Sequence, residues 1–180
     1  IWYPTDTVSL EAVYIPYEQA DRWPDDYKEA ITASSLSKFG ANENTVSYDS
    51  LDFSPKSAIP GAKLSYRSNA ADFSVSYLYD IDQYYTPVIT TTAGPIYGIN
   101  SISLERKRIH RFGADAKTTV GTFGLWFEGA YSLTENSGSD DWSTRKSKFD
   151  YTAGIDTNFG PNDSYYVNFQ LIGSWIPGYN

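Results

Sequence analysis

Apolar and polar residues alternate along seven segments of the chain, and each segment keeps the phase of its alternation. In the segment Leu125–Glu135 the odd positions from Leu125 to Leu133 are apolar or glycine, whereas the even positions include Glu128 and Ser132. A period of two residues predicts a β-strand whose two faces differ in polarity. The other segments are Thr7–Tyr14, Lys63–Arg67, Phe73–Asp82, Ser101–Val120, Phe149–Phe159 and Tyr165–Trp175. The chain is therefore expected to be all-β.

The connections between these segments are alternately short and long. Tight turns are expected where Gly, Pro, Asn and Asp supply the required backbone conformations, at Pro4–Asp6, Ala70–Asp72, Thr119–Phe123 and Gly160–Asp163. The longer, polar connections are Glu18–Pro60, Thr90–Asn100 and Asn136–Ser147. Tight periplasmic turns and larger external loops are typical of outer-membrane barrels. We therefore predict an antiparallel transmembrane β-barrel with short periplasmic turns and long external loops.

Composition restricts the alternatives. The 180 residues suit one barrel domain, 1–180, in which 18–60 form a long loop insertion. No apolar stretch approaches the roughly 18 residues of a transmembrane helix. The formal net charge of −8 argues against a nucleic-acid partner, which would require a basic surface. Cysteine is absent, so a thiolate metal site is excluded, and we predict neither a metal nor a cofactor.

The number of segments suggests that the barrel is only partly present. Bacterial single-chain barrels have an even number of strands, whereas this sequence predicts seven. The chain also opens with Ile1-Trp2-Tyr3 directly before a predicted turn, which resembles the tail of a further strand. We therefore expect a segment of a larger barrel.

The strand sequences follow one another in a recognisable order. The relevant runs are 61–67 and 73–82, then Phe112-Gly-Ala-Asp-Ala, Gly124-Leu-Trp-Phe-Glu-Gly-Ala-Tyr, Tyr151-Thr-Ala-Gly-Ile-Asp and Val167-Asn-Phe-Gln-Leu-Ile-Gly. This series resembles the strands of a porin-like Gram-negative outer-membrane β-barrel family of unknown function, related to alginate-export-type barrels. The resemblance covers roughly two thirds of the chain. It implies a barrel in the bacterial outer membrane, but its motifs are those of strands, so it carries over no functional residue.

Most charged residues of the predicted strands share the polar phase. These candidates are Glu11, Lys63, Arg67, Asp80, Asp82, Arg111, Asp115, Lys117, Glu128, Asp150 and Asp156. Facing a wet lumen, they would be tolerated, whereas on the lipid face each would cost a few kcal/mol near the midplane. As a set they are candidates for a selectivity field, although any single one can instead belong to a network that holds the strands in register. Because acids outnumber bases, we expect a weak preference for cations.

The run from Arg106 to Arg111 is the strongest local charge feature. Its phase sends Arg106, Arg108 and His110 outward, where they are candidates for contact with lipopolysaccharide phosphates. The alternative is a solvated strand end. His110 is the only histidine and the sequence has no Gly-x-Ser-x-Gly motif, so we predict no enzyme and no catalytic residue. Acidic pairs such as Asp80 with Asp82 could bind calcium, but neighbouring acids are usually only solvated.

Together these patterns predict an outer-membrane porin-like channel for passive passage of small polar solutes. Its expected partners are outer-membrane lipid and lipopolysaccharide, with a homo-oligomer or a barrel-associated protein as further options. One alternative is a scaffold barrel that encloses or anchors a partner protein and conducts little. The other is a soluble β-sandwich with its apolar faces packed together, which binds carbohydrate through exposed aromatic residues such as Trp23, Tyr27, Trp142 and Trp175.

Overall fold

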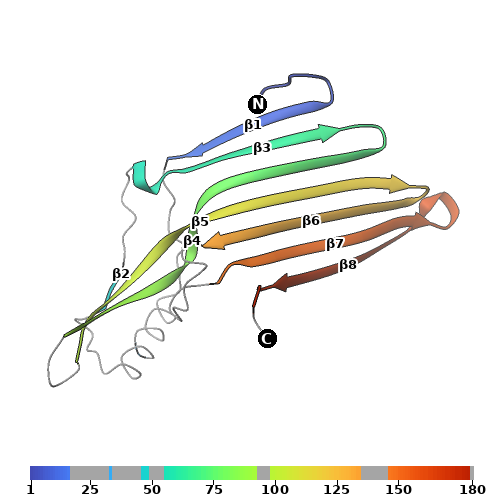
Figure 1. Cartoon of the computed structure of the whole chain (residues 1–180). Coiled ribbons are helices and arrows are strands. Elements are labelled where there is room, and N and C mark those ends of the chain that lie inside the picture. Colours follow the sequence, from blue (N-terminus) through green and yellow to red (C-terminus); the bar gives the residue numbers. More distant parts are fainter. Residues whose placement is uncertain (17–32, 34–45, 49–54, 93–97, 135–145, 179–180) are drawn as a thin grey trace.

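The computed structural model of the chain contains a single β-sheet among the residues it describes (Figure 1). These residues are 1–16, 33, 46–48, 55–92, 98–134 and 146–178. The strands are β1 (Val8–Ile15), β2 (Val46–Tyr48), β3 (Ile59–Arg67), β4 (Ala71–Thr92), β5 (Gly98–Val120), β6 (Phe123–Thr134), β7 (Lys148–Phe159) and β8 (Tyr165–Trp175). Two single-turn 3₁₀ helices, η2 (Pro55–Ser57) and η3 (Pro161–Asp163), lie in the connections.

Seven of the strands cross the sheet in the order β1-β3-β4-β5-β6-β7-β8, and each neighbouring pair is antiparallel. Each of them contains or overlaps one of the seven segments of alternating polarity, so the prediction of an all-β antiparallel fold is confirmed. The sheet is not closed into a barrel. β2 was not predicted, because three residues are too few to show a period of two; it pairs in parallel with 102–104 of β5.

The short connections all lie at one end of the sheet, on the right in Figure 1. Residues 68–70, 121–122 and 160–164 join successive strands there, next to the N-terminal turn that leads into β1. Gly121 and Gly160 have φ values of 63° and 87°, a left-handed conformation that glycine adopts without strain. The turn after β3 begins earlier than predicted, because the Ser68 hydroxyl accepts a hydrogen bond of 3.1 Å from the backbone N–H of Ala71.

β4 and β5 are 22 and 23 residues long, about twice the length of β6, β7 and β8. The prediction of a connection over 90–100 is therefore wrong at its ends, since β4 continues to Thr92 and β5 begins at Gly98. Between the Ile81–Arg108 and Tyr85–Arg106 pairs, three residues of β4 oppose one of β5. Such a bulge bends a strand pair. Beyond it, the two strands bend out of the sheet and project past β6 and β7 (Figure 1).

Most of the other two predicted loops lies outside the described residues. The described part of 18–60 consists of residue 33, β2, η2 and 58–60, which include the first two residues of β3. Of 136–147, only Lys146 and Ser147 are described.

The two edges of the sheet differ in what pairs with them. At the outer edge of β1, Trp2 and Leu10 exchange two backbone hydrogen bonds of 2.8 Å, so the opening residues pair like the end of a strand. β8 forms the opposite edge and pairs only with β7 among the described strands. Because β1 and β8 both start at the end with the short turns, they run in the same direction (Figure 1).

Buried apolar side chains are few and lie toward the end of the sheet with the long connections. They are Ala58, Ile59, Ile81, Ile102, Leu104 and Ile109. The rest of the sheet, toward the short turns, is a single layer with large apolar side chains exposed. Packing therefore does not bury the apolar side of the strands within the part of the chain described.

Candidate functional site

The eleven predicted charged residues lie on one side of the sheet, here called the polar face. On β5 this face carries Arg111, Asp115 and Lys117, and the opposite, apolar face carries Phe112 and Ala114. Directly paired residues project from the same side of a sheet. Successive pairings align Glu11 with Lys63, Asp115 with Glu128, and Asp150 with Ser174, and strand alternation adds the remaining candidates. The predicted common face is thus present, although Asp80 and Asp82 are buried.

Among the described residues, three ion pairs on the polar face involve the predicted charged residues: one reaches from β3 across β4 to β5, one joins β4 to β5, and one lies within β7. Lys63 Nζ lies 3.3 Å from Asp115 Oδ1, Arg111 Nη2 lies 3.1 Å from Asp80 Oδ2, and Lys148 Nζ lies 2.6 Å from Asp150 Oδ2. At least one partner in each pair is substantially exposed, so each contributes at most about 1 kcal/mol. Their main effect is to cancel charge locally.

The remaining candidates on this face have no ion-pair partner among the described residues. They are Glu11, Arg67, Lys117, Glu128 and Asp156, while Asp82 accepts a 3.1 Å hydrogen bond from the backbone N–H of Tyr84. After pairing, the polar face keeps isolated charges of both signs.

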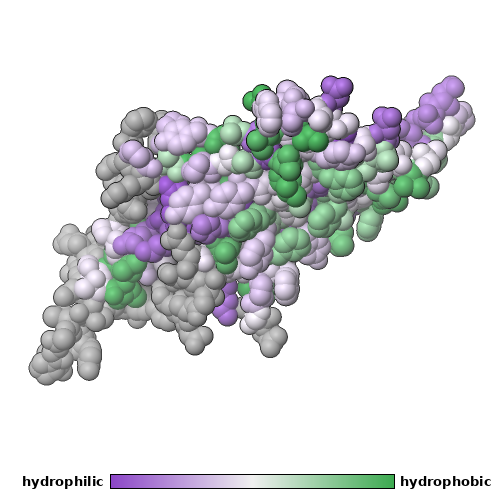
Figure 2. Space-filling view, turned by 45° about the horizontal axis from the view of Figure 1, so that its top comes forward, coloured by the Kyte–Doolittle hydropathy of each residue, from purple (hydrophilic) through white to green (hydrophobic). Residues whose placement is uncertain are grey.

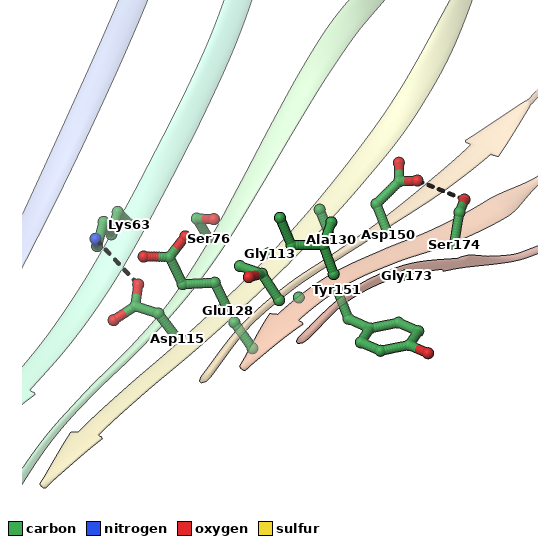
Figure 3. A pocket seen from close by; sticks show the side chains of 14 residues that line it. Lys63, Ser76, Gly113, Asp115, Glu128, Ala130, Asp150, Tyr151, Gly173 and Ser174 are labelled. Atoms are coloured by element: carbon green, nitrogen blue, oxygen red, sulfur yellow. Dashed lines mark hydrogen bonds and ion pairs between the residues drawn. The ribbon is translucent and has the colours of Figure 1, made fainter. Parts of the chain in front are cut away.

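A wide hollow, here called the central trough, lies in the middle of the polar face and has a volume of about 800 Å³ (Figure 3). Ser76, Gly113 and Ala130 lie side by side on its floor, since each is paired with the next across β4, β5 and β6. A Cβ atom added at Gly113 would lie 2.5 Å from Ser76 Oγ, so glycine keeps this floor low. Lys63, Asp115, Glu128, Asp150 and Ser174 surround it.

Three polar residues of this face were not among the predicted charged candidates, although the alternation already places Ser74 and Ser174 on the polar side of their strands. Lys148 was not included, although it pairs with Asp150, and Ser174 donates a 2.6 Å hydrogen bond to Asp150 Oδ1. The hydroxyl of Ser74 donates to Asp115. Their even-numbered positions on β4, β7 and β8 indicate that they lie on the polar face, because they continue the polar phase of each strand.

The burial of Asp80 and Asp82 corrects their predicted role. Their exposed fractions are 6% and 4%, so they present little surface to a solute passing along this face. Asp80 instead anchors Arg111. Their carboxylates are tolerated because each has a partner, which a buried charge requires.

The apolar face is extensively exposed along the seven antiparallel strands. On β8, Phe169 and Leu171 are 67% and 55% exposed, and on β4 Phe73 and Val75 are 51% and 56% exposed. Figure 2 shows a band of hydrophobic residues on the surface of the molecule. Between the short turns and the Tyr79–His110 pair, this phase of the strands contains no Asp, Glu, Lys or Arg among the described residues.

Polar aromatic residues and cations mark the far limit of the apolar face. Tyr77 Oη and His110 Nδ1 are 2.8 Å apart, and the Tyr79 and His110 ring centroids are 5.1 Å apart. The Arg108 guanidinium lies over the Tyr79 ring, 4.8 Å from its centroid. At the opposite limit, by the short turns, the Phe159 and Tyr165 rings stack with centroids 5.4 Å apart.

The predicted outward cluster of Arg106, Arg108 and His110 is only partly present. Arg108 and His110 are half-buried beside the tyrosines, but Arg106 is 7% exposed and cannot reach a surrounding phosphate in this structure. The alternation of polarity predicted which side of the sheet Arg106 faces, but it did not predict that Arg106 is buried. Beyond the bulge, Arg106 pairs with Tyr85 in the part of the sheet where buried residues collect.

Within the described parts of the chain, no three His, Cys, Asp or Glu side chains come together in a metal-binding arrangement. The same residues include no helix that is long and apolar enough to cross a membrane. Of the residues suggested for carbohydrate binding, Trp23, Tyr27 and Trp142 lie outside the described residues, and Trp175 is 60% exposed on the apolar face.

Comparison with known proteins found no matching family model, no matching curated protein and no matching solved structure.

Proposed function

We propose that the sheet is part of the wall of a transmembrane β-barrel in a Gram-negative-type outer membrane. This proposal rests on one observation: between the short turns and the Tyr79–His110 pair, each of the seven antiparallel strands keeps an uncharged, exposed apolar side and a more polar side in register with its neighbours. In water, contiguous exposed apolar surface of this kind is rare on a stable monomer. Lipid on one side and water on the other satisfy both faces.

The height of the apolar face supports this proposal. On β5 it extends from Val120, beside a short turn, to His110, which is ten residues away. Ten residues at about 3.3 Å each span roughly 33 Å along the strand, or roughly 25 Å along the membrane normal at a tilt of about 40°. The apolar band of outer-membrane barrels is about 25 Å tall. Aromatic residues at both limits, such as Tyr79 and Tyr165, suit the two headgroup regions.

The strand directions are compatible with closure. Residues 1–3 run antiparallel to β1 along its outer edge, and β8 runs in the same direction as β1. The two free edges are therefore antiparallel to each other. They could pair directly, or through an even number of further strands, and preserve the antiparallel order of a barrel.

We infer that the barrel is a passive, porin-like channel for small polar solutes. The polar face forms a wet, charged wall with a low floor of Ser76, Gly113 and Ala130. Glu128 retains an uncompensated carboxylate beside this floor, which favours a weak preference for cations. Lipid and lipopolysaccharide would contact the apolar face, with Arg108 and His110 at its headgroup limit.

The test is single-channel recording in planar bilayers, after establishing whether the protein needs detergent to stay in solution. Stable conductance steps from a detergent-dependent protein support the channel. Detergent dependence without conductance favours a scaffold barrel whose lumen is filled by a partner. Solubility as a monomer without detergent would overturn the membrane proposal and favour a β-sandwich.

A further inference from the structure

The polar face contains a second, smaller hollow at the end near the long connections. It lies between the β4 bulge at 82–84 and the first residues of β7, and we call it the neck pocket. Its volume is about 120 Å³. A water molecule occupies roughly 30 Å³ in the liquid, so the pocket has room for a small oxyanion with a few waters.

The neck pocket and the central trough have opposite charge balances. The neck pocket is lined by three cations, Arg111, Lys146 and Lys148, and by two carboxylates, Asp82 and Asp150. The central trough is lined by one cation, Lys63, and by three carboxylates. The net charge of the lining residues therefore changes sign between the two hollows, although both hollows lie on one face of the same sheet.

The carboxylates around the neck pocket already have partners. Asp150 binds Lys148 at 2.6 Å and Ser174 at 2.6 Å, and Asp80, on the neighbouring strand β4, binds Arg111 at 3.1 Å. Lys146 makes no ion pair with any described residue. Asp150 and Asp80 thus neutralise Lys148 and Arg111, whereas Lys146 keeps its positive charge at the pocket rim.

Two residues that line this pocket also contain a buried polar atom without a hydrogen-bond partner. Thr134 is 6% exposed and its hydroxyl makes no hydrogen bond, and Arg111 Nε is likewise buried without a partner. Buried donors are rarely left unsatisfied in folded proteins, so each such group requires an explanation. An oxyanion accepts several hydrogen bonds at once and would satisfy donors of both kinds.

We propose that the neck pocket binds a small oxyanion of the phosphate or carboxylate class through Lys146, Arg111 Nε and the Thr134 hydroxyl. The site rests on the pocket and its donors, and it does not require the sheet to line a channel. Within a channel it would hold small anionic solutes at one end of a face whose centre favours cations.

The experiment is equilibrium dialysis of the purified, detergent-solubilised protein against radiolabelled inorganic phosphate at constant ionic strength. Thr134→Val keeps the side-chain shape and removes the hydroxyl, and Lys146→Gln removes the charge. Each should weaken phosphate binding by about 3-fold to 10-fold, the usual effect of losing one hydrogen bond or charge-assisted contact. Acetate should compete with phosphate, because both present oxygen acceptors.

The matched control is Lys117→Gln, which removes a cation from the same face, near the short turns. Its phosphate affinity should stay within about 2-fold of the wild type. Absence of phosphate binding by the wild type, or equal losses in Lys117→Gln and Lys146→Gln, would overturn the proposed site. Circular dichroism confirms that each variant is folded. Because dialysis measures no current, this inference can fail while conductance persists, and the channel can fail while phosphate still binds.

Discussion

The two faces of this sheet are built from the same strands, yet they differ in every property that decides their surroundings. The polar face places Lys63, Asp115 and Glu128 around a low floor of small residues. The apolar face, one residue out of phase, presents Val75, Phe169 and similar side chains with no charge between its two limits. A difference of one residue in phase therefore separates a surface suited to water from a surface suited to hydrocarbon.

The comparison shows where this fold obtains its stability. Only a small group of apolar side chains is buried, near the bulge, and most of the sheet is a single layer. Hydrogen bonds between neighbouring strands satisfy the backbone N–H and C=O groups, but no described residue covers the apolar face. Stability in the paired region should therefore depend on the solvent that meets that face, whereas the buried group near the bulge should depend on it less.

The largest effect is expected from a charge placed on the apolar face. Ala114 lies exposed near the middle of this face on β5, so Ala114→Arg should cost about 2 to 4 kcal/mol of stability in a bilayer. The measurement is urea unfolding of the protein folded into lipid vesicles. Ala130→Arg, on the floor of the central trough, provides the matched control and should cost less than about 1 kcal/mol. Equal costs at the two alanines would show that the faces do not meet different solvents.

A second test concerns packing on the polar face. A Cβ added at Gly154 would lie 2.3 Å from the Trp126 ring, which sits directly opposite on β6. Gly154→Ala should therefore destabilise the fold by about 1 to 2 kcal/mol by displacing the indole. Vesicle unfolding again gives the measurement. In a Trp126→Leu background the same substitution should cost less than half as much; an unchanged cost would mean that the indole is not the obstacle.

A smaller effect is expected at the limit of the apolar face. Tyr77→Phe removes the hydroxyl that lies 2.8 Å from His110 Nδ1 and should cost about 0.5 to 1 kcal/mol. Tyr66→Phe is the control, since the Tyr66 hydroxyl is on the same face and has no hydrogen-bond partner among the described residues. Similar losses in both variants would argue against a specific role for the Tyr77–His110 contact.

The smallest effect is expected for the ion selectivity of the polar face. Glu128→Gln should reduce the cation-to-anion permeability ratio roughly 2-fold, equivalent to about 0.4 kcal/mol, because it removes a carboxylate that no cation compensates. The readout is the reversal potential in a salt gradient. Asp6→Asn makes the same charge change in the exposed N-terminal turn and should leave the ratio unchanged. A shift of the same size in both would mean that net charge, rather than position, sets selectivity.

The strands and their faces could be predicted because each depends on local alternation. Phe149–Phe159 and Tyr165–Trp175 were predicted with nearly the observed bounds, since side chains in a strand must point to alternate sides. The full length of β4 and β5 could not be predicted in this way. The bulge at 82–84 interrupts the phase, and the strand pair continues past the point where a period of two can be read.

The alternation of residues along each strand specifies which side chains share a face, because the period of a strand is a local property of the backbone. The burial of these side chains and their partners depend on the folded sheet, which buries Asp80 and Arg106, places Lys63 beside Asp115, and brings Lys146 and Thr134 to one pocket. Those outcomes depend on the register between strands that are distant in the chain and on the bend after the bulge. No local pattern specifies either of them, because both arise from pairing across the sheet.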